Sequence, residues 1–258
     1  MQYHTITSAM SGDAAIVTLN RPDMMNALTS QLRQELLEAI IHAQTSARVL
    51  VITGAGRAFC SGQDLADFNG LGAIDIERVL RDEYEPLLNA IYDCPIPTIV
   101  ALNGAAVGAG VNLALAADVV FAAQSASLSQ SFTRIGLIPD AGGTYWLPRQ
   151  IGLPRAMGAA LFADKITATQ AADWGMIYEA VADPDFDAHW RARAAHLAAG
   201  PTAAYARVKA ALRASLANDL ASQLALEARL QGECGATADF AEGVAAFLEK
   251  RPAKFIGR

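Results

Sequence analysis

Residues 103–123 have the sequence NGAAVGAGVNLALAADVVFAA, and this segment indicates the fold most clearly. The segment opens with glycine and alanine, continues with apolar residues at helical spacing, and ends in a β-branched and apolar run. This pattern predicts a turn of small residues, a helix over 108–117 and a strand over 118–123. A continuous apolar run at 97–104, PTIVALNG, leads into this segment, shares its first two residues and is typical of a buried strand. The order strand, helix, strand indicates an α/β fold with parallel pairing.

The same alternation extends over most of the chain. Expected strands cover 3–9, 14–20 and 49–56, and expected helices cover 29–47 and 75–92. After about residue 142 helices dominate, and residues 201–250 have almost no strand pattern. We therefore expect an α/β core over 1–200 and a helical C-terminal region over 201–258. The many alanines and leucines of that region suggest that it covers a subunit interface.

Composition restricts the class of protein. The chain has 258 residues, of which 53% are hydrophobic and 18% charged, with a net charge of −6. This balance favours a folded globule and argues against nucleic acid or an anionic membrane as the main partner. The three cysteines have no CxxC spacing and the four histidines are isolated, so we expect a reducing compartment and no metal. No signal peptide is evident and the longest apolar run is too short to span a bilayer, which together predict a cytoplasmic protein.

Two glycine-rich loops follow expected buried strands, at 54–65 (GAGRAFCSGQDL) and 103–110. Backbone N–H groups in such loops, and at the start of the helix that follows the second one, can point at an oxygen that becomes negative during a reaction. A plain strand-to-helix connection and close packing through small residues are the alternatives. The GxGxxG and GxxxxGK[ST] patterns are absent, which disfavours nicotinamide and flavin enzymes.

Asp140 is the acid of a third loop, GLIPDAGGTYWLPR at 136–149. From Pro95 to Pro139 the formal charges are Asp118 and Arg134 alone, so Asp140 follows a strongly apolar stretch. A carboxylate is costly to bury in such surroundings unless it has a partner or a function. Three interpretations remain open: a surface turn residue, a helix N-cap for residues 141–143, or a functional acid.

Four motifs occur in this order along the chain: NRPDMMNAL (20–28), AFCSGQDL (58–65), the 103–123 segment and GLIPDAGGTYWLPR. Together they resemble the crotonase superfamily, the enoyl-CoA hydratase/isomerase family. The resemblance continues through WGMIYEAV (174–181) to FAEGVAAFLEKRPAKF (240–255). It implies a crotonase-like spiral of ββα repeats with a helical C-terminal trimerisation region. It also implies an acyl-CoA substrate, a homotrimer or dimer of trimers, and no separate cofactor, because coenzyme A is part of the substrate.

The resemblance also assigns residues. It implies that the backbone N–H groups of Gln63 and Ala109 stabilise a thioester enolate, for which one such donor contributes roughly 3–4 kcal/mol. The residues it places along the path of coenzyme A are Met25, Ala27, Arg57, Cys60 and Gly62. In the C-terminal tail it places Lys254 and Phe255 against the coenzyme A of a neighbouring subunit, with a solvated tail as the alternative.

The acids separate the reactions of the family. Typical hydratases have two glutamates, and the matching positions here are Asn112 and Phe132, so the ordinary hydration mechanism lacks both of its acids. The isomerases keep one acid, at the place of Asp140, and GLIPDxGGTxxLPR resembles the members that isomerise ring epoxides of phenylacetyl-CoA. We therefore expect an isomerase that shifts a double bond or rearranges a ring epoxide with Asp140 as its single base. A hydratase of the same family and a non-catalytic acyl-CoA-binding relative are the alternatives.

Four further side chains receive structural expectations. Asp118 is expected to hold a strand end, and Asp64 to cap or anchor a loop. Tyr145 and Trp146 are expected in the core in preference to the wall of an acyl pocket.

Overall fold

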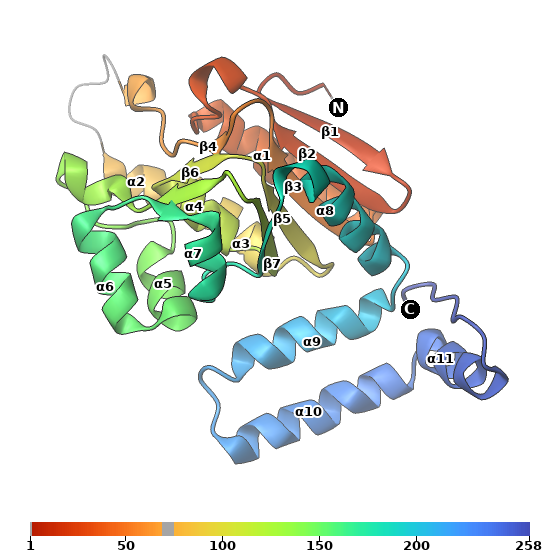
Figure 1. The fold of residues 1–258 in the computed structure, drawn as a ribbon. Coiled ribbons are helices and arrows are strands. Elements are labelled where there is room, and N and C mark those ends of the chain that lie inside the picture. The colour runs from red at the N-terminus through yellow and green to blue at the C-terminus, as the bar shows by residue number, and fades with distance from the viewer. Residues whose placement is uncertain (1, 69–74) are drawn as a thin grey trace.

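The computed structural model describes residues 2–68 and 75–258. Two β-sheets form the centre, and successive strands of the chain alternate between them, as β3 and β4, β5 and β6, and β7 and β8 show. Each turn of the chain therefore adds one strand to each sheet before helical structure follows (Figure 1). This is the expected spiral of ββα repeats.

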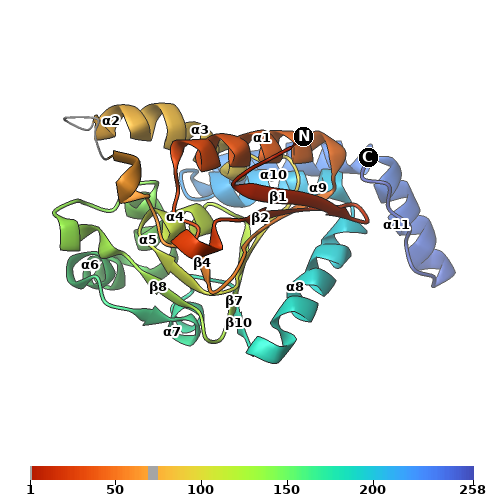
Figure 2. The same cartoon turned by 90° about the horizontal axis from the view of Figure 1, so that it is seen from above.

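The larger sheet has the strand order β1-β2-β3-β5-β7-β10, antiparallel between β1 and β2 and parallel from β2 onward. Its strands are β1 (Ile6–Ser11), β2 (Ala14–Leu19), β3 (Val49–Gly54), β5 (Thr98–Leu102), β7 (Val119–Ala123) and β10 (Glu179–Val181). The central strands are buried on both faces, since α1 (Ser30–Ser46) and α8 (Asp183–Ala198) pack on opposite sides (Figure 2). Burial on both faces explains the continuous apolar runs of the sequence.

The smaller sheet has the order β4-β6-β8-β9. Its strands are β4 (Ala58–Cys60), β6 (Ala105–Val107), β8 (Ser127–Ser129) and β9 (Ile166–Thr167). The sequence did not predict them, because segments of two or three residues are too short to show an alternating pattern. β4 and β6 lie within the two segments that were expected to be glycine-rich loops.

The remaining helices mostly match their expected ranges. The stretch expected as a helix over 75–92 is α2 (Ile76–Val79), a π-helical turn (Leu80–Tyr84) and α3 (Glu85–Tyr92). The helix expected over 108–117 is α4 (Ala109–Leu115). Further along lie α5 (Gly143–Ile151), α6 (Leu153–Phe162) and α7 (Ala168–Asp173).

The C-terminal helices α9 (Thr202–Ala214), α10 (Leu220–Gly235) and α11 (Ala238–Glu249) project from the α/β body (Figure 1). Asp118 attaches α9 to the large sheet. Its carboxylate accepts hydrogen bonds from the Thr98 backbone and hydroxyl, and pairs with Lys209 and Arg213 of α9 at 2.7 Å each. Asp118 therefore has the structural role that was expected. No helix within residues 2–68 and 75–258 is long and apolar enough to cross a membrane.

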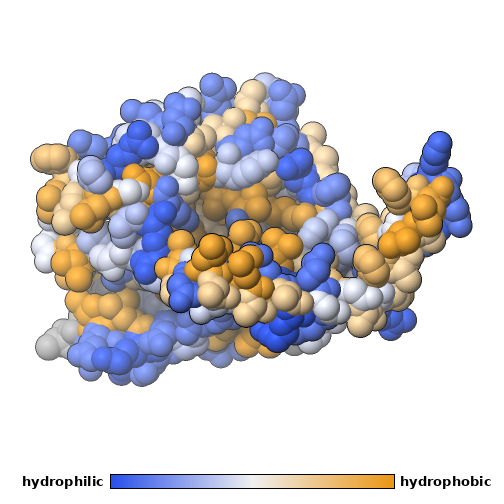
Figure 3. Space-filling model, turned by 90° about the horizontal axis from the view of Figure 1, so that it is seen from below, coloured by the Kyte–Doolittle hydropathy of each residue, from blue (hydrophilic) through white to orange (hydrophobic). Residues whose placement is uncertain are grey.

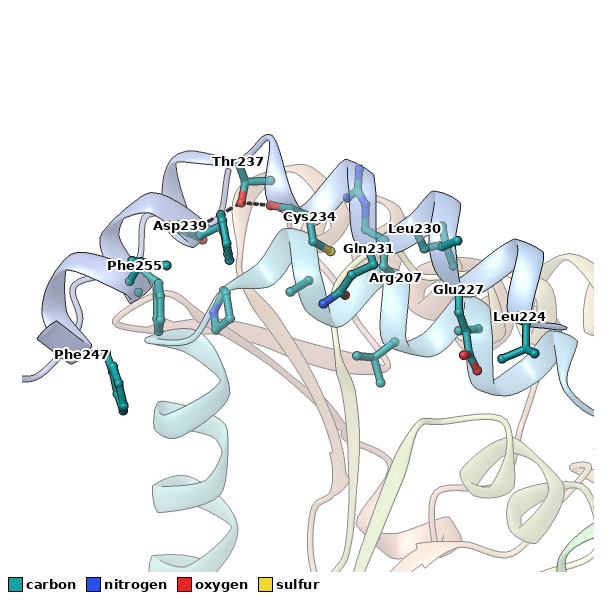
Figure 4. A pocket seen from close by; sticks show the side chains of 18 of the residues that line it. Arg207, Leu224, Glu227, Leu230, Gln231, Cys234, Thr237, Asp239, Phe247 and Phe255 are labelled. Carbon is teal, nitrogen blue, oxygen red and sulfur yellow. Dashed lines mark hydrogen bonds between the residues drawn. The ribbon is translucent and has the colours of Figure 1, made fainter.

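The helical arm exposes a large apolar groove of about 890 Å³ between α9, α10 and α11. Figure 4 shows the side chains that line it, from Leu224 on α10 to Phe247 on α11. Apolar side chains gather on the same side of the molecule in the space-filling view (Figure 3). Phe247 is 82% exposed and Leu248 73% exposed. Exposed apolar patches of this size mark a contact surface.

Candidate active site

The first two glycine-rich loops meet because strands β4 and β6 pair side by side. Gly62, after β4, has φ 90° and packs directly on the turn after β6: a Cβ there would lie 2.8 Å from the Val107 carbonyl oxygen and 3.5 Å from the Ala109 nitrogen. Gly108, with φ 54°, precedes the first residue of α4. Both positions therefore require glycine.

These turns leave two backbone donors beside one cavity. Gln63 and Ala109 line a cavity of about 230 Å³, and within the described residues neither backbone N–H has a hydrogen-bond partner. Ala109 is the first residue of α4, whose N–H has no acceptor inside the helix. The two residues expected to supply the oxyanion donors therefore line a common cavity.

The side chain of Gln63 is held by residues that the sequence did not single out. Arg33 of α1 donates from Nη1 to Gln63 Oε1 at 2.6 Å, and the Tyr84 hydroxyl donates to the same oxygen at 2.7 Å. Arg33 is 2% exposed and also donates to the Leu28 carbonyl oxygen. An arginine on the buried face of an otherwise amphipathic helix was the signal that could have revealed it. Glu83 balances its charge.

Asp140 lies in the wall of the same cavity. Burial raises the pKa of its carboxyl group to about 6, and its own backbone N–H opposes that shift. Its Oδ1 is buried and has no hydrogen-bond partner in the described structure. The N-cap interpretation is wrong, because α5 begins at Gly143 with Gly142 as its N-cap and receives no side-chain cap. A half-buried acid with one buried and unpartnered oxygen is a candidate for proton transfer.

A second cavity of about 460 Å³ is also lined by Asp140 and shares Leu80 and Tyr84 with the first. Its wall is aromatic: Tyr92 and Trp146 have ring centroids 5.1 Å apart, and Tyr145 stands edge-on to Trp146 at 4.7 Å. Tyr145 is 38% exposed, so the preference for a core position was wrong for this residue, whereas Trp146 packs against the core. Both rings line a cavity.

The segment expected to hold coenzyme A lies beside the β4 loop. Leu28 pairs with Gln63, the Ser61 N–H donates to the Met25 carbonyl oxygen, and Asn26 donates to the carbonyls of Ala55 and Ala58. The structure thus brings the neighbourhoods of Met25, Ala27, Arg57 and Gly62 together. Cys60 is fully buried under Gly110, and burial raises its pKa to about 12, so it contacts protein and not the cavity.

The two tail residues lie elsewhere. Lys254 donates its backbone N–H to Glu242, and Phe255 lines the groove of the helical arm. Within one chain neither of them reaches the cavity of Asp140. Asp64 anchors its loop, as expected, by pairing with Arg21 at 2.9 Å and accepting the Ala66 N–H. Among the described residues no cluster of His, Cys, Asp and Glu is arranged to hold a metal ion.

Comparison with known proteins identifies the family. The model of the enoyl-CoA hydratase/isomerase family matches residues 10–258. The chain belongs to this family. As a family member, it is 64% identical over 258 residues to a probable enoyl-CoA hydratase of Rhodobacter capsulatus, with all of both chains covered. It is 41% identical to the 1,2-epoxyphenylacetyl-CoA isomerase of Escherichia coli, with 98% of each chain covered.

Solved structures of the family agree with the fold. The crystal structure of an enoyl-CoA hydratase from Bacillus anthracis superposes with a TM-score of 0.92 at 31% identity, over 99% of this chain and all of the other. The resemblance to the crotonase superfamily drawn from four motifs is thereby confirmed, as is the fold class.

Proposed function

We propose that the chain is an acyl-CoA isomerase in which Asp140 is the single base and the Gln63 and Ala109 N–H groups stabilise an enolate. One observation carries the proposal: Asp140 is the one carboxylate among the described residues that line the cavity of these two donors. The positions where hydratases carry glutamates are Asn112, which is fully buried, and Phe132, which lines the cavity wall. Neither can hold or release a proton.

The reaction is a proton shift between two carbons of the acyl group. The carboxylate of Asp140 takes a proton from carbon, and the electron pair moves into the thioester, whose oxygen accepts hydrogen bonds from the two backbone N–H groups. The protonated carboxyl group then returns the proton to the carbon two positions away, and the double bond moves with it. A pKa near 6 suits a group that must hold the proton between two steps.

The second cavity supports a ring-bearing acyl group as the substrate. Its aromatic wall of Tyr92, Tyr145 and Trp146 suits a planar ring, which stacks on such side chains. The isomerase of Escherichia coli at 41% identity is named for a phenyl-epoxide substrate. We extend the proposal to ring epoxides of aromatic acyl-CoA on this basis.

Hydration of an enoyl-CoA is the second candidate, because the relative at 64% identity is named a probable enoyl-CoA hydratase. The two reactions differ in mass: an isomer keeps the mass of its substrate, whereas hydration adds one water. Incubation with 3-enoyl, 2-enoyl and ring-epoxyphenylacetyl CoA esters, followed by mass spectrometry, distinguishes them. Hydration of a 2-enoyl-CoA at roughly 100 per second or faster would show that the chain is a hydratase.

Asp140→Asn tests the base directly, since it keeps the size of the side chain and removes the base. Isomerisation should fall by about three orders of magnitude or more, with binding of the CoA ester retained. In deuterated water the wild type should incorporate deuterium at carbon and the variant should not. If the variant folds, binds the ester and isomerises it at a rate within about tenfold of wild type, Asp140 is a turn residue and not the base.

We also propose that the groove of the helical arm is covered by further copies of the chain in a trimer or dimer of trimers. A neighbouring copy would then bring its Lys254 and Phe255 to the coenzyme A. The large exposed apolar area of α10 and α11 supports this assembly.

A further inference from the structure

A pair of buried amides lies beneath the loop that carries Asp140. Asn112 of α4 is fully buried and Gln130, directly after β8, is 1% exposed. Gln130 Nε2 donates to Asn112 Oδ1 at 2.8 Å, and Asn112 Nδ2 donates to the backbone carbonyl oxygen of Asp140 at 2.7 Å. A carbonyl oxygen can only accept, so it fixes which end of the Asn112 amide faces the loop.

The loop above this pair has an unusual backbone. Ala141 has φ 48° and Gly142 has φ 82°, so two successive residues are left-handed and one of them has a side chain. A left-handed alanine costs roughly 1–2 kcal/mol, which surrounding contacts must offset. Gly143 donates its N–H to the Asp140 carbonyl oxygen at 2.8 Å, the same oxygen that Asn112 holds.

The contact between Asn112 and the loop is also a steric one. A Cβ on Gly143 would lie 2.5 Å from Asn112 Nδ2, too close for any real side chain. Gly143 has no left-handed φ, so this contact is what requires glycine there. The loop therefore rests on Asn112 through one hydrogen bond and one tight van der Waals contact.

Asn112 belongs to the same short helix as the donor Ala109, within a single turn of it. We propose that Asn112 is a positioning residue, which fixes the Asp140 carboxylate relative to the Ala109 N–H by tying the loop of the base to the helix of the donor. The inference rests on the proposed function for its catalytic consequence. Gln130 supports it by holding the Asn112 amide in one orientation.

A carboxamide is the side chain that this position needs. An ionised acid at 112 would place an acceptor against the Asp140 carbonyl oxygen and a like charge near the Asp140 carboxylate. The asparagine at the position of the hydratase glutamate therefore does more than remove an acid. It also supplies the N–H donor that holds the loop of Asp140.

The first test is Asn112→Leu, which keeps the approximate volume and removes all three side-chain hydrogen bonds of Asn112, including the longer one from Nδ2 to Gln130 Oε1 at 3.4 Å. Thr98→Val is the matched control, because Thr98 is as buried as Asn112. The substitution removes a hydroxyl that hydrogen-bonds to Asp118, away from the cavity. For Asn112→Leu we expect kcat to fall by about 10- to 100-fold with KM within about threefold, since misplacing a catalytic group by about 1 Å has this effect. The control should keep both constants.

Hydrogen exchange supplies a readout that needs no substrate. Backbone amides of residues 141–147 should exchange at least about tenfold faster in Asn112→Leu than in wild type, and unchanged in Thr98→Val. Faster exchange together with a lowered kcat supports the inference. An Asn112→Leu protein with wild-type kcat, or with unchanged exchange in this segment, overturns it even if the wild type proves to be an isomerase. A wild type that converts no CoA ester overturns the proposed function, whereas faster exchange in the variant would still support the tie between loop and helix.

A second pair of variants covers the case in which Asn112→Leu does not fold. Gly143→Ala pushes against Asn112 and should lower kcat, whereas in an Asn112→Ala background the added methyl has room. The effects of the two substitutions on kcat and on exchange should therefore be strongly non-additive. Additive effects would show that the two residues do not act through their contact, and would overturn the inference.

Discussion

The surroundings of Asp140 favour its protonated form. As the pH rises and Asp140 ionises, activity should therefore increase and stability should decrease. Burial raises its pKa from the ordinary 3.8 to about 6. The carboxylate is the active form of a base, so kcat/KM should rise with pH up to about 6 and then level off. A pH–rate profile of the wild type from pH 4.5 to 8 measures this. A flat profile would show that no group of this pKa takes part.

The same pKa predicts a stability gain on removing the charge. Because the pKa of Asp140 is raised in the folded state, its protonated form contributes fully to stability below pH 3.8. This contribution is lost as the pH rises toward 6 and stays absent above it. At pH 8, Asp140→Asn should therefore unfold at higher urea concentration than wild type. Its free energy of unfolding should be higher by about 2–3 kcal/mol at most at pH 8, and by much less at pH 4.5. Equal stability of both proteins at pH 8 would mean that water solvates the carboxylate well.

Single residues were predictable where their chemistry is local. Asp140 was found because an acid stands out beside an apolar run, and Gly62 and Gly108 because small residues mark close approaches. Arg33 and Tyr84 were missed, since their contacts with Gln63 join segments separated by 30 and 21 residues. The position of Arg33 on the buried face of its helix marks it as unusual, but no local pattern indicates that it or Tyr84 contacts Gln63.

Among the elements, the helices and the long buried strands were predictable and the small sheet was not. The runs that became β3 and β5 are long enough to show their character, whereas β4 and β6 have three residues each inside glycine-rich turns. The small sheet nevertheless decides the site, because its pairing brings Gln63 next to Ala109. Its existence depends on tertiary contacts between turns of the spiral.

The start of α4 can be tested through its first N–H. Ala109→Pro removes this donor, and because Ala109 is the first helical residue, where proline is tolerated, the helix should persist. We expect kcat to fall by about 100-fold or more. Ala109→Gly keeps the N–H and is the control, which should stay within a few-fold of wild type. A folded Ala109→Pro protein with normal turnover would exclude this donor.

The attachment of α9 depends on Asp118, which is largely buried and meets two cations of that helix. Asp118→Ala leaves both cations without their partner and should lower the free energy of unfolding by about 3 kcal/mol. Asp187→Ala, which removes an exposed pair with Arg191 on α8, should cost less than about 1 kcal/mol. Urea titration measures both. Similar losses for the two variants would contradict the role given to Asp118.

At the scale of the whole molecule, the helical arm predicts an assembly. Phe247→Glu places a charge in the apolar surface of α11, and we expect it to shift the protein to smaller species, as light scattering after gel filtration would show. Met10→Glu is the control, since Met10 is an exposed apolar residue of β1 outside the groove. A wild type that is monomeric at micromolar concentration would contradict the assembly.

The place of Asp140 in a wall that both cavities share has a stereochemical consequence. A substrate that extends from the oxyanion donors into the aromatic cavity presents one side of its planar enolate to that wall. The proton then leaves from this side and returns to this side, because the carboxyl group that carries it stays where it is. The double-bond shift proposed for this chain is therefore suprafacial, and the configuration of a deuterium label at the new tetrahedral carbon would reveal the face on which Asp140 stands.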